Sequence, residues 1–356
     1  MWSPSSTRPS RPRSPVSTQT GRAGARLPGT TTISDAEQLA VVIRNGFIES
    51  RHAGSAVVLG ADGEVKRSLG DPSATIYTRS ALKPLQSLAM HAAGLVLADD
   101  EERAISLASH SGTPGHVTIV QRMLDAGSLA EDQLLCPADW PMGSDARDAL
   151  LRAGGERRRI LMCCSGKHAA MLRTCQVNGW SVDGYVAPEH PLQVAIRETV
   201  QRFTGEKPSP VGVDGCGAPV LGLSLLGLAK AYRRMATSEA NSPFPLHRTA
   251  AQLIGAARAE PWVVEGPGRP DTVVSERLGV FAKFGAEGIS VIAAPDGTVA
   301  VVKVLDGAAR AATIVAIELL AKAGALPADA GDQVRQELRL DVWGGGVPVG
   351  RIEATV

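Results

Sequence analysis

Short apolar runs at the two ends of the chain predict β-strands. Two β-rich segments, 55–60 and 64–69, flank Ala61-Asp62-Gly63, and an Asp-Gly step between such runs is a strong hairpin signal. Near the C-terminus three further strand-like runs follow one another, at 279–284, 288–293 and 299–304. The last two are joined through Pro295-Asp296-Gly297, which predicts a second hairpin.

Between these two β regions the apolar positions recur with a helical period. The predicted helices span 80–93, 99–108, 116–126, 166–178, 190–203, 218–235 and 245–258, and a longer one follows at 308–323. Strands at both ends with helices between them predict an α+β fold. We expect an antiparallel sheet formed by N- and C-terminal strands, with a helical subdomain of roughly 80–260 inserted between them.

Composition divides the chain into a short tail and one large domain. Residues 1–34 are mostly Ser, Thr, Pro, Gly and Arg, with five arginines and no acid, which leaves 32 basic and 36 acidic residues in the rest. Such a segment cannot bury enough apolar surface to offset the entropy of ordering. We therefore predict a disordered tail at 1–34 and a single domain at 35–356.

The same composition argues against several classes of partner. The body carries no basic stripe, so nucleic acid is not expected, and no apolar run approaches the length of about 18 residues that a membrane span needs. Five cysteines lie between Cys136 and Cys216 at irregular spacing. An odd, scattered set does not indicate a disulfide framework, and the expected location is the cytoplasm.

The first candidate for chemistry is the Ser80-x-x-Lys83 pair at the start of the first predicted helix. A serine hydroxyl is a weak nucleophile until a base takes its proton, and a lysine three residues on lies on the same helical face. Once desolvated, that lysine can act as the base. The pair suggests acyl transfer, although a structural serine near a helix N-cap followed by a solvated lysine produces the same sequence pattern.

Two further segments place polar groups at predicted turns. In the first, a strand-like run ends at Cys163 and Cys164, and a helix begins with Lys167 and His168. In the second, three glycines surround Asp214 and Cys216, between a short strand and the helix predicted at 218–235. Two thiolates from separate loops can share a zinc ion but do not complete its tetrahedral site. His168 and Lys167 are both candidates for the third ligand.

Two other positions would complete an acyl-transfer site. Ser109 belongs to a dense group of hydroxyls at the end of a predicted helix, and Lys283 lies on a predicted strand just before Gly285. A lysine on a sheet edge beside a small residue can face a serine hydroxyl or a substrate carboxylate. A solvated strand lysine is the ordinary alternative.

Taken together, four blocks resemble the successive signatures of the rhizobial-type (class 3) L-asparaginases, the asparaginase II family. They are Ser80-Ala81-Leu82-Lys83-Pro84, Ser109-His110-Ser111-Gly112, Cys164-Ser165-Gly166-Lys167-His168 and Asp214-Gly215-Cys216-Gly217. The resemblance runs from about residue 39 to residue 350, in order and with no block missing. It implies a fold similar to serine β-lactamases and serine glutaminases, which also use a Ser-x-x-Lys pair, with Lys283-Phe284-Gly285 in place of their Lys-Thr-Gly strand.

The resemblance also implies an activity, the hydrolysis of L-asparagine to L-aspartate and ammonia by a cytoplasmic homodimer. It assigns Ser80 with Lys83 to one Ser-Lys couple and Ser109 with Lys283 to a second. The remaining assignments are zinc ligands and substrate contacts. Cys164, Lys167 and Cys216 would bind zinc, in a structural or substrate-positioning role, and Arg79, Asp214 and His168 would contact the amino acid.

One departure and two alternative functions accompany the resemblance. Where the family pattern suggests an acid after Ser111-Gly112, this chain has Thr113-Pro114, and Ser111 remains an alternative counterpart of Ser109. A penicillin-recognising peptidase or β-lactamase-like acyltransferase would share the Ser-x-x-Lys pair. A non-catalytic, zinc-stabilised amino-acid-binding protein would need only Cys164 and Cys216 as a staple between loops.

Overall fold

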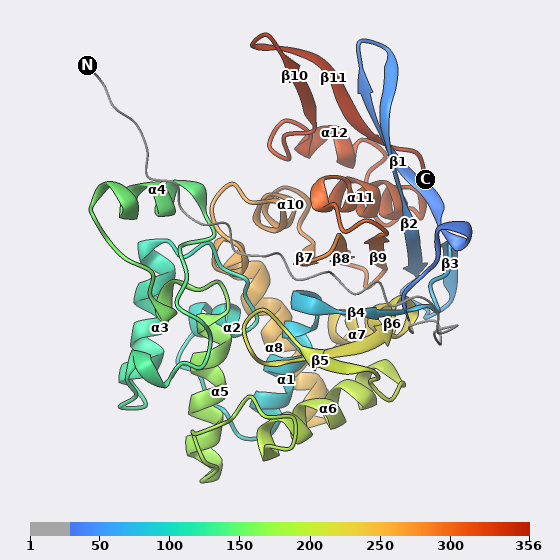
Figure 1. The fold of residues 1–356 in the computed structure, drawn as a ribbon. Helices are drawn as coiled ribbons and strands as arrows, with labels where there is room; N and C mark the ends of the chain where they lie inside the picture. Colours follow the sequence, from blue (N-terminus) through green and yellow to red (C-terminus); the bar gives the residue numbers. More distant parts are fainter. Residues whose placement is uncertain (1–28) are drawn as a thin grey trace, which may run out of the picture.

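A computed structural model describes residues 29–356, which form a sheet with a helical region packed beneath it (Figure 1). The sheet has eight antiparallel strands in the order β10-β11-β1-β2-β9-β8-β7, and β3 pairs with the far part of β2. Its members are β1 (Glu37–Arg44), β2 (Phe47–Leu59), β3 (Val65–Leu69), β7 (Phe281–Gly285), β8 (Ile289–Ala293), β9 (Val299–Val304), β10 (Asp341–Gly344) and β11 (Val347–Ala354). The α+β class and the sheet of N- and C-terminal strands are confirmed.

The central strands are apolar on both faces because helices cover both. On β2, Val57 and Leu59 join one hydrophobic core, whereas Ala56 and Val58 join the other. Successive strand side chains point to opposite faces, so one short apolar run supplies both cores. Fully burying a valine or leucine contributes about 1.5–3 kcal/mol. This doubly covered sheet is the rigid frame on which the β7 edge is held.

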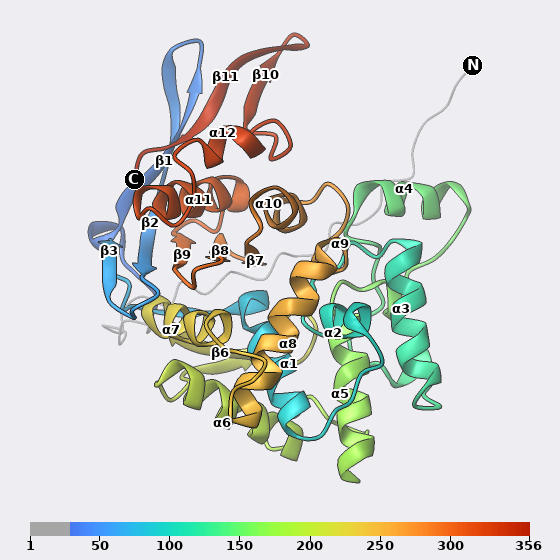
Figure 2. The ribbon, with the colours of Figure 1, turned by 180° about the vertical axis from the view of Figure 1, so that it is seen from behind.

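The helices fall into two groups (Figures 1 and 2). On one side of the sheet, α11 contacts β8 and β9, and α12 and α10 extend that layer; on the other side α7 contacts β2 and β9 and leads into the helical region. The helices are α1 (Lys83–Ala92), α2 (Asp100–Ser106), α3 (Pro114–Asp125), α4 (Ser144–Arg152), α5 (Ser165–Asn178), α6 (Pro191–Thr204), α7 (Leu225–Ala236), α8 (Pro245–Ala259), α9 (Pro261–Val264), α10 (Pro270–Leu278), α11 (Ala312–Lys322) and α12 (Ala330–Val334). All the predicted helices are present except for the first third of 218–235, whereas α4, α9, α10 and α12 had no predicted counterpart.

The prediction of one helix over 218–235 is wrong for its first third. A strand, β6 (Pro219–Ser224), lies between β4 (Thr75–Tyr77) and β5 (Val211–Val213) in a small second sheet. The proline sits at the first residue of the strand, where its missing N–H is tolerated. Ser224 then begins α7 as its N-cap, because its side chain accepts a hydrogen bond from the backbone N–H of Gly227. The turn that carries Cys216 therefore leads into a strand and not into a helix.

The prediction of a strand at 160–164, ending at the two cysteines, is also wrong. It forms a 3-10 helix, η4 (Arg159–Leu161), and α5 begins at Ser165. Ile160 is fully buried in the core beneath the sheet, so its hydrophobicity reflects packing and not strand pairing. A short apolar run cannot be distinguished from a buried helical turn by periodicity alone.

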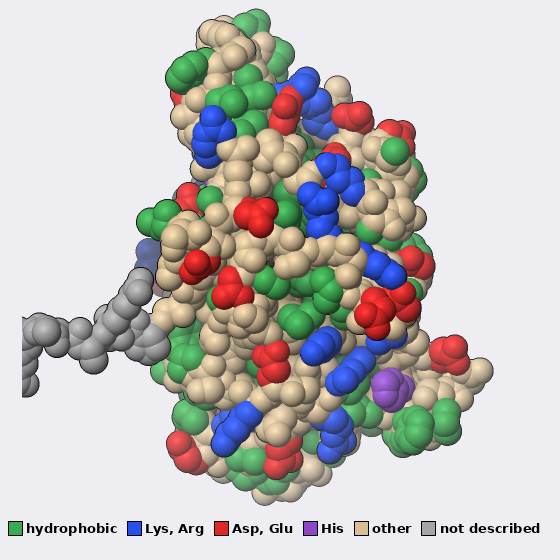
Figure 3. All heavy atoms as spheres, turned by 90° about the vertical axis from the view of Figure 1, so that its right-hand side faces the viewer, with side chains coloured by type: hydrophobic (Ala, Val, Ile, Leu, Met, Phe, Trp, Pro, Cys, Tyr) green, Lys and Arg blue, Asp and Glu red, His purple; other side chains and the backbone are tan. Residues whose placement is uncertain are grey.

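Two hairpins project from the body at the end of the sheet remote from β7 (Figure 1). The turn between β1 and β2 and the turn between β10 and β11 form this projection, and Phe47, Trp343 and Val347 on it are more than half exposed. Figure 3 shows apolar side chains at the top of the molecule, and basic and acidic side chains interspersed over the face below.

The predicted tail is described only in its last part. Residues 1–28 lie outside the described residues, while Thr31 is buried and its hydroxyl is 3.1 Å from that of Ser55 on β2. A 3-10 helix, η1 (Ile33–Asp35), leads into β1. Within residues 29–356 no helix has the length and apolar character that crossing a membrane requires.

Candidate active site

The Ser80-x-x-Lys83 pair lies where the helical region meets the sheet. Arg79–Leu82 form a 3-10 helix, η2, that continues directly into α1, with Pro84 in the first turn. Arg79 has a φ of 47°, an uncommon and strained conformation for a residue with a Cβ, of the kind that clusters at functional sites. Ser80 is half-buried, whereas Lys83 is almost completely buried.

Lys83 is held by the loop that follows α2. Its Nζ donates to the hydroxyl of Ser109 at 2.8 Å and to the carbonyl oxygen of Ala108 at 2.5 Å. Ser109 is itself buried, and its backbone N–H donates to the carbonyl of Val264 at the end of α9. The lysine and the serine therefore form a direct, water-shielded contact, although they were predicted to belong to different couples.

Lys283 reaches the same region from β7, the edge strand. This strand packs on η2 so closely that a Cβ added to Gly285 would lie 3.0 Å from the carbonyl oxygen of Thr78. Lys283 is fully buried, and burial, opposed by Asp271 and assisted by the charge of Lys83, lowers its pKa to about 8. A lysine in this condition is partly neutral near pH 7 and can accept a proton.

Two carboxyl groups that were not predicted lie behind Lys283. Asp271, in the first turn of α10, has its Oδ2 3.8 Å from Lys283 Nζ and accepts a hydrogen bond of 2.7 Å from the backbone N–H of Phe284. Glu265 is close by, and burial followed by the charge of Asp271 raises its pKa to about 7. Their only sequence signal is a Gly- and Pro-rich segment with an acid at each end.

The Ser109 loop is braced by side chains of the same signature block. His110 is buried, its Nε2 is 2.9 Å from the hydroxyl of Ser165, and burial lowers its pKa well below the usual range. Ser111 donates to the carbonyl oxygen of Glu265 and not to a lysine. Thr113 caps α3, accepting from His116 N while His116 reaches back to Thr113 N, so Thr113-Pro114 begins a helix where an acid was expected.

The predicted metal ligands meet below this loop. Lys167 Nζ is 3.2 Å from Cys216 Sγ, and the neighbouring Cys164 thiol together with burial raises the pKa of Cys216. Burial alone would lower the pKa of Lys167, but the adjacent sulfurs of Cys216 and Cys164 outweigh it and raise it. His168 lies beside Cys216, and its Nδ1 is 2.7 Å from the Tyr185 hydroxyl.

The donor atoms of this sulfur cluster decide whether it can hold zinc. Within residues 29–356 no three His, Cys, Asp or Glu side chains converge on one point, so the two thiols need a nitrogen as the third donor. Lys167 is in contact already, whereas the buried Nε2 of His168, which has no hydrogen-bond partner among the described residues, does not converge with both thiols. Two sulfurs and one nitrogen fit zinc, provided that Lys167 gives up its proton.

Arg79 and Asp214 form the rim of the site. The Arg79 Nε donates to the Asp214 carboxylate at 2.8 Å, and Arg79 Nη1 is 3.7 Å from Glu287 in the turn after β7. Burial would raise the pKa of Asp214, but Lys167, the N–H of Gly215 and Arg79 together lower it. A cavity of about 550 Å³ is lined by Arg79 together with Tyr77 and Glu287.

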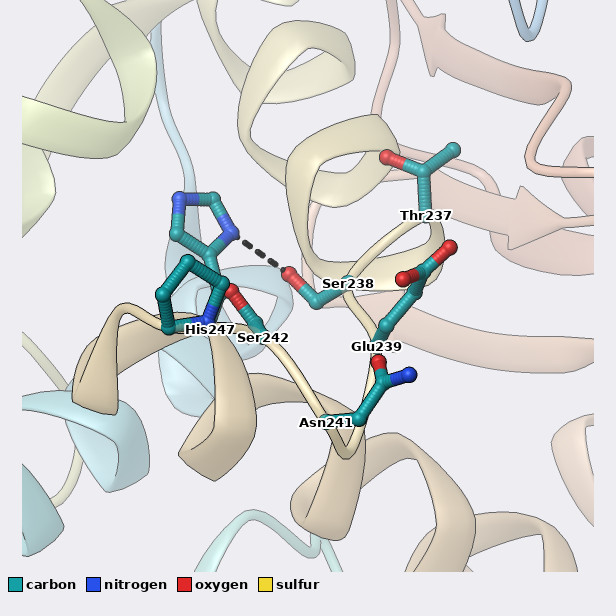
Figure 4. Close-up of a pocket in the computed structure, with 7 residues that line it drawn as sticks. Thr237, Ser238, Glu239, Asn241, Ser242 and His247 are labelled. Carbon is teal, nitrogen blue, oxygen red and sulfur yellow. Dashed lines mark hydrogen bonds between the residues drawn. The ribbon is translucent and has the colours of Figure 1, made fainter.

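A second cavity, of about 430 Å³, lies away from these groups. It is formed by the turn after α7, from Thr237 to Pro243, together with His247 (Figure 4). The one hydrogen bond between its drawn side chains joins Ser238 Oγ and His247 Nδ1, at 2.8 Å. Neither lysine of the candidate site contributes to it.

The structure thus brings most of the predicted residues together, with one difference in pairing. Lys83 contacts Ser109, and Lys283 approaches both Lys83 and Asp271. The Ser80 hydroxyl forms no hydrogen bond among the described residues. Glu265 and Asp271 are the functional candidates that sequence reasoning missed, because neither has a recognisable motif.

The search of curated proteins found no match. Among solved structures, a putative β-lactamase from Bacteroides dorei is 13% identical, with 80% of this chain and 93% of that chain covered and a TM-score of 0.41. A β-lactamase from Mycobacterium bovis is 16% identical, with 76% and 94% covered and a TM-score of 0.40.

A third structure, described as Mglu in its glutamate form, is 11% identical with a TM-score of 0.42. The alignment covers 76% of this chain but only 61% of that one. With TM-scores below 0.5, none of these likenesses bears on the activity of this chain. The sequence profile of L-asparaginase II, by contrast, matches residues 40–354, nearly the whole chain. The chain therefore belongs to the L-asparaginase II family, and by that membership to the amidohydrolases.

Proposed function

We propose that this protein hydrolyses the side-chain amide of L-asparagine, giving L-aspartate and ammonia, through the serines and lysines at the junction of η2 and β7. One observation carries the proposal: a buried lysine, Lys83, donates directly to the hydroxyl of Ser109, beside a second buried lysine. Buried ammonium groups are costly, and two of them together have a functional explanation in acyl transfer.

Ser80 supplies the nucleophile in this proposal. Its hydroxyl is the more accessible of the two, whereas Ser109 is buried and already bound to Lys83. The Ser80 proton passes through the Lys83–Ser109 pair to neutral Lys283, and Ser80 Oγ adds to the amide carbon. The proton on Lys283 then moves to the leaving nitrogen, the C–N bond breaks and ammonia departs. Water hydrolyses the resulting ester, again with Lys283 as the proton acceptor.

The rim residues would bind the charged ends of the amino acid. Arg79 offers a guanidinium to the α-carboxylate, and Asp214 offers a carboxylate to the α-ammonium. Here the two side chains form an ion pair with each other, so their charges are held in place without exposing either one alone. His168 would line the inner side, next to Cys216.

The direct test is an ammonia-release assay across L-asparagine, L-glutamine and short peptides, with and without a chelator. Turnover of asparagine at a rate well above that of the peptides supports the proposal. No ammonia from any of these amides, from folded protein, would contradict it. Labelling of Ser80 by a fluorescent penicillin would instead favour the acyltransferase alternative.

The pH dependence provides a separate prediction. Because Lys283 must be neutral to accept a proton and burial lowers its pKa to about 8, only about a tenth is neutral at pH 7. We expect kcat/KM for asparagine to rise about tenfold from pH 6 to pH 7 and to level off above pH 8. The measurement is a kcat/KM profile from pH 5.5 to 9.5, and a flat profile between pH 6 and 8 would remove Lys283 as the base.

We further propose that Cys164, Lys167 and Cys216 bind zinc. The ion would supply a fixed positive charge that holds the loop carrying Asp214 against the start of α5, where His168 lies. This suits a positioning role, since a serine already provides the nucleophile. In its absence the ammonium of Lys167 can neutralise the two sulfurs, so proton and metal compete for the same place.

Elemental analysis tests the zinc proposal. Protein purified without added metal is expected to hold about one zinc per chain, and Cys216→Ser is expected to lose most of it. Cys175→Ser is the matched control, because Cys175 is also fully buried, on α5, but belongs to no such cluster. Equal zinc in the parent and in Cys216→Ser would exclude Cys216 as a ligand.

A further inference from the structure

The segment from Val264 to Asp271 connects the two halves of the candidate site. At its start, the carbonyl of Val264 accepts from the backbone N–H of Ser109, and the carbonyl of Glu265 accepts from the Ser111 hydroxyl. At its end, Asp271 accepts from the backbone N–H of Phe284 on β7. A single short segment therefore positions both the Ser109 loop and the strand that carries Lys283.

This segment has little freedom to move. Gly266 has a φ of 142°, and a Cβ there would collide with the Ser111 hydroxyl, so only glycine allows the two loops to approach this closely. The Gly266 N–H donates to Thr272 Oγ1, whose own hydroxyl donates to the Pro261 carbonyl. These two hydrogen bonds tie the start of α10 back to α9 and to Gly266, so the position of Asp271 is fixed.

Asp271 is arranged to act on Lys283. Both side chains are essentially unexposed, and their charged atoms are 3.8 Å apart. One carboxylate oxygen, Oδ2, is fixed by the Phe284 N–H, whereas Oδ1 is buried without a hydrogen-bond partner among the described residues. A buried acceptor left unsatisfied is costly in a purely structural role. It has a use beside a lysine that gains and loses a proton, because its negative charge stabilises the ammonium form.

Glu265 completes the arrangement as the second carboxyl group. Its Oε2 accepts from the backbone N–H of Asp271 at 2.8 Å, and its Oε1 accepts from Arg269 Nε at 3.1 Å. Two adjacent buried carboxyl groups do not both ionise readily, so the charge of Glu265 limits the charge that Asp271 can carry. Arg269 is partly exposed and connects the pair to solvent.

We propose that Asp271 is the positioning residue for Lys283, and that the Asp271–Glu265 pair sets whether Lys283 carries its proton during the reaction. Lys283 becomes a base when its Nζ loses a proton to solvent, and the negative charge shared by the two carboxyl groups sets the pH at which this happens. When neutral Lys283 then accepts the serine proton, an O–H bond breaks and an N–H bond forms, and the Asp271 carboxylate stabilises the new ammonium group.

The inference rests on the proposed function only in giving Lys283 a catalytic role. The groups that act on its charge come from each neighbouring element: Asp271 on α10, Glu265 after α9, Lys83 on α1 and Cys163 before α5. Of these, the two carboxyl groups and Cys163 favour the protonated lysine, whereas Lys83 and burial oppose it. Loss of the Asp271 charge is therefore expected to make Lys283 easier to deprotonate.

The test compares the parent with Asp271→Asn, which keeps the size of the side chain and an oxygen that can accept from Phe284 N–H. The protein is labelled with [ε-¹³C]lysine, and the Lys283 resonance is assigned as the one missing from Lys283→Met. We expect the titration midpoint of this resonance to fall by about one pH unit in Asp271→Asn. The rising limb of the kcat profile should move down equally, with kcat at its plateau reduced roughly a hundredfold.

The control is Glu102→Gln, which removes another buried carboxylate that pairs with a cation, Arg122, away from Lys283. Glu102→Gln should change neither the titration midpoint of Lys283 nor the rising limb of the kcat profile. Should Asp271→Asn fail to fold, Glu265→Gln gives the same readout with a smaller shift in the same direction. An unchanged Lys283 midpoint in the folded variant would overturn the inference.

The spectroscopic readout separates this inference from the proposed function. A shifted Lys283 midpoint in protein that releases no ammonia would contradict the asparaginase proposal but uphold the Asp271–Lys283 coupling. If the parent turned over asparagine but Asp271→Asn moved neither the Lys283 titration midpoint nor the rising limb of the kcat profile, the asparaginase proposal would stand and the Asp271–Lys283 coupling would be overturned.

Discussion

Ser80→Ala is expected to reduce ammonia release from L-asparagine by roughly 10⁴-fold or more, because removal of a covalent nucleophile removes the reaction path and not only one contact. Folding should be unaffected. The hydroxyl of Ser80 is half-buried and forms no hydrogen bond among the described residues, so the free energy of unfolding should change by less than about 0.5 kcal/mol. The measurements are steady-state ammonia release and thermal unfolding of the same preparations.

Ser87→Ala is the matched control for this experiment. Ser87 lies on α1 two turns beyond Ser80, and its hydroxyl is 2.6 Å from that of Ser106, outside the site. It should retain the parent kcat. Near-normal turnover by Ser80→Ala would remove Ser80 as the nucleophile, and if Ser109→Ala were then inactive, Ser109 would take its place. Loss of activity in Ser87→Ala as well would show that the assay reports damage to α1.

Lys83→Met is expected to reduce kcat about 10²- to 10⁴-fold, the usual contribution of a positioned proton-transfer group. Methionine has a similar length and no charge, so the substitution removes the bonds to Ser109 and Ala108 without leaving a large cavity. Because a buried ammonium is costly to desolvate, stability should be retained. Single-turnover kinetics with asparagine would locate the loss in the acylation step.

An exposed lysine on α7, Lys230, provides the control for loss of an ammonium group. Lys230→Met should behave as the parent. If Lys83→Met kept its activity while Lys283→Met lost it, Lys83 would be a structural cation that holds the Ser109 loop, and Lys283 alone would handle the proton.

The fold was predicted well wherever one segment carried its own signal. The Asp62-Gly63 hairpin is confirmed by the register of β2 against β3, and the strands at 279–284, 288–293 and 299–304 are confirmed as β7, β8 and β9. Local turn chemistry and short apolar runs are sufficient there. The strand β6 was missed because its six residues are all buried, and a uniformly apolar run has no alternation to distinguish it from a helix.

In the candidate site, too, the residues with a local sequence motif were predicted and those without one were missed. Ser80, Lys83, Ser109, Lys283 and the cysteine blocks were selected from short motifs, and the family match over residues 40–354 supports the resemblance on which their roles depend. The sequence could not predict which lysine contacts which serine, because Lys83 and Ser109 are 26 positions apart and meet only when α1 packs against the loop after α2. Asp271 and Glu265 carry no motif at all.

The amino-acid sequence alone determined the α+β class and the order of most elements, and it selected the candidate site residues, since these depend on local periodicity and on residue chemistry. Only the tertiary structure decided which lysine contacts which serine, that β7 brings Lys283 onto η2, and that two carboxyl groups lie behind it. The reason is physical: burial and the charges of neighbours set the ionisation of a lysine, and both come from segments that are distant along the chain.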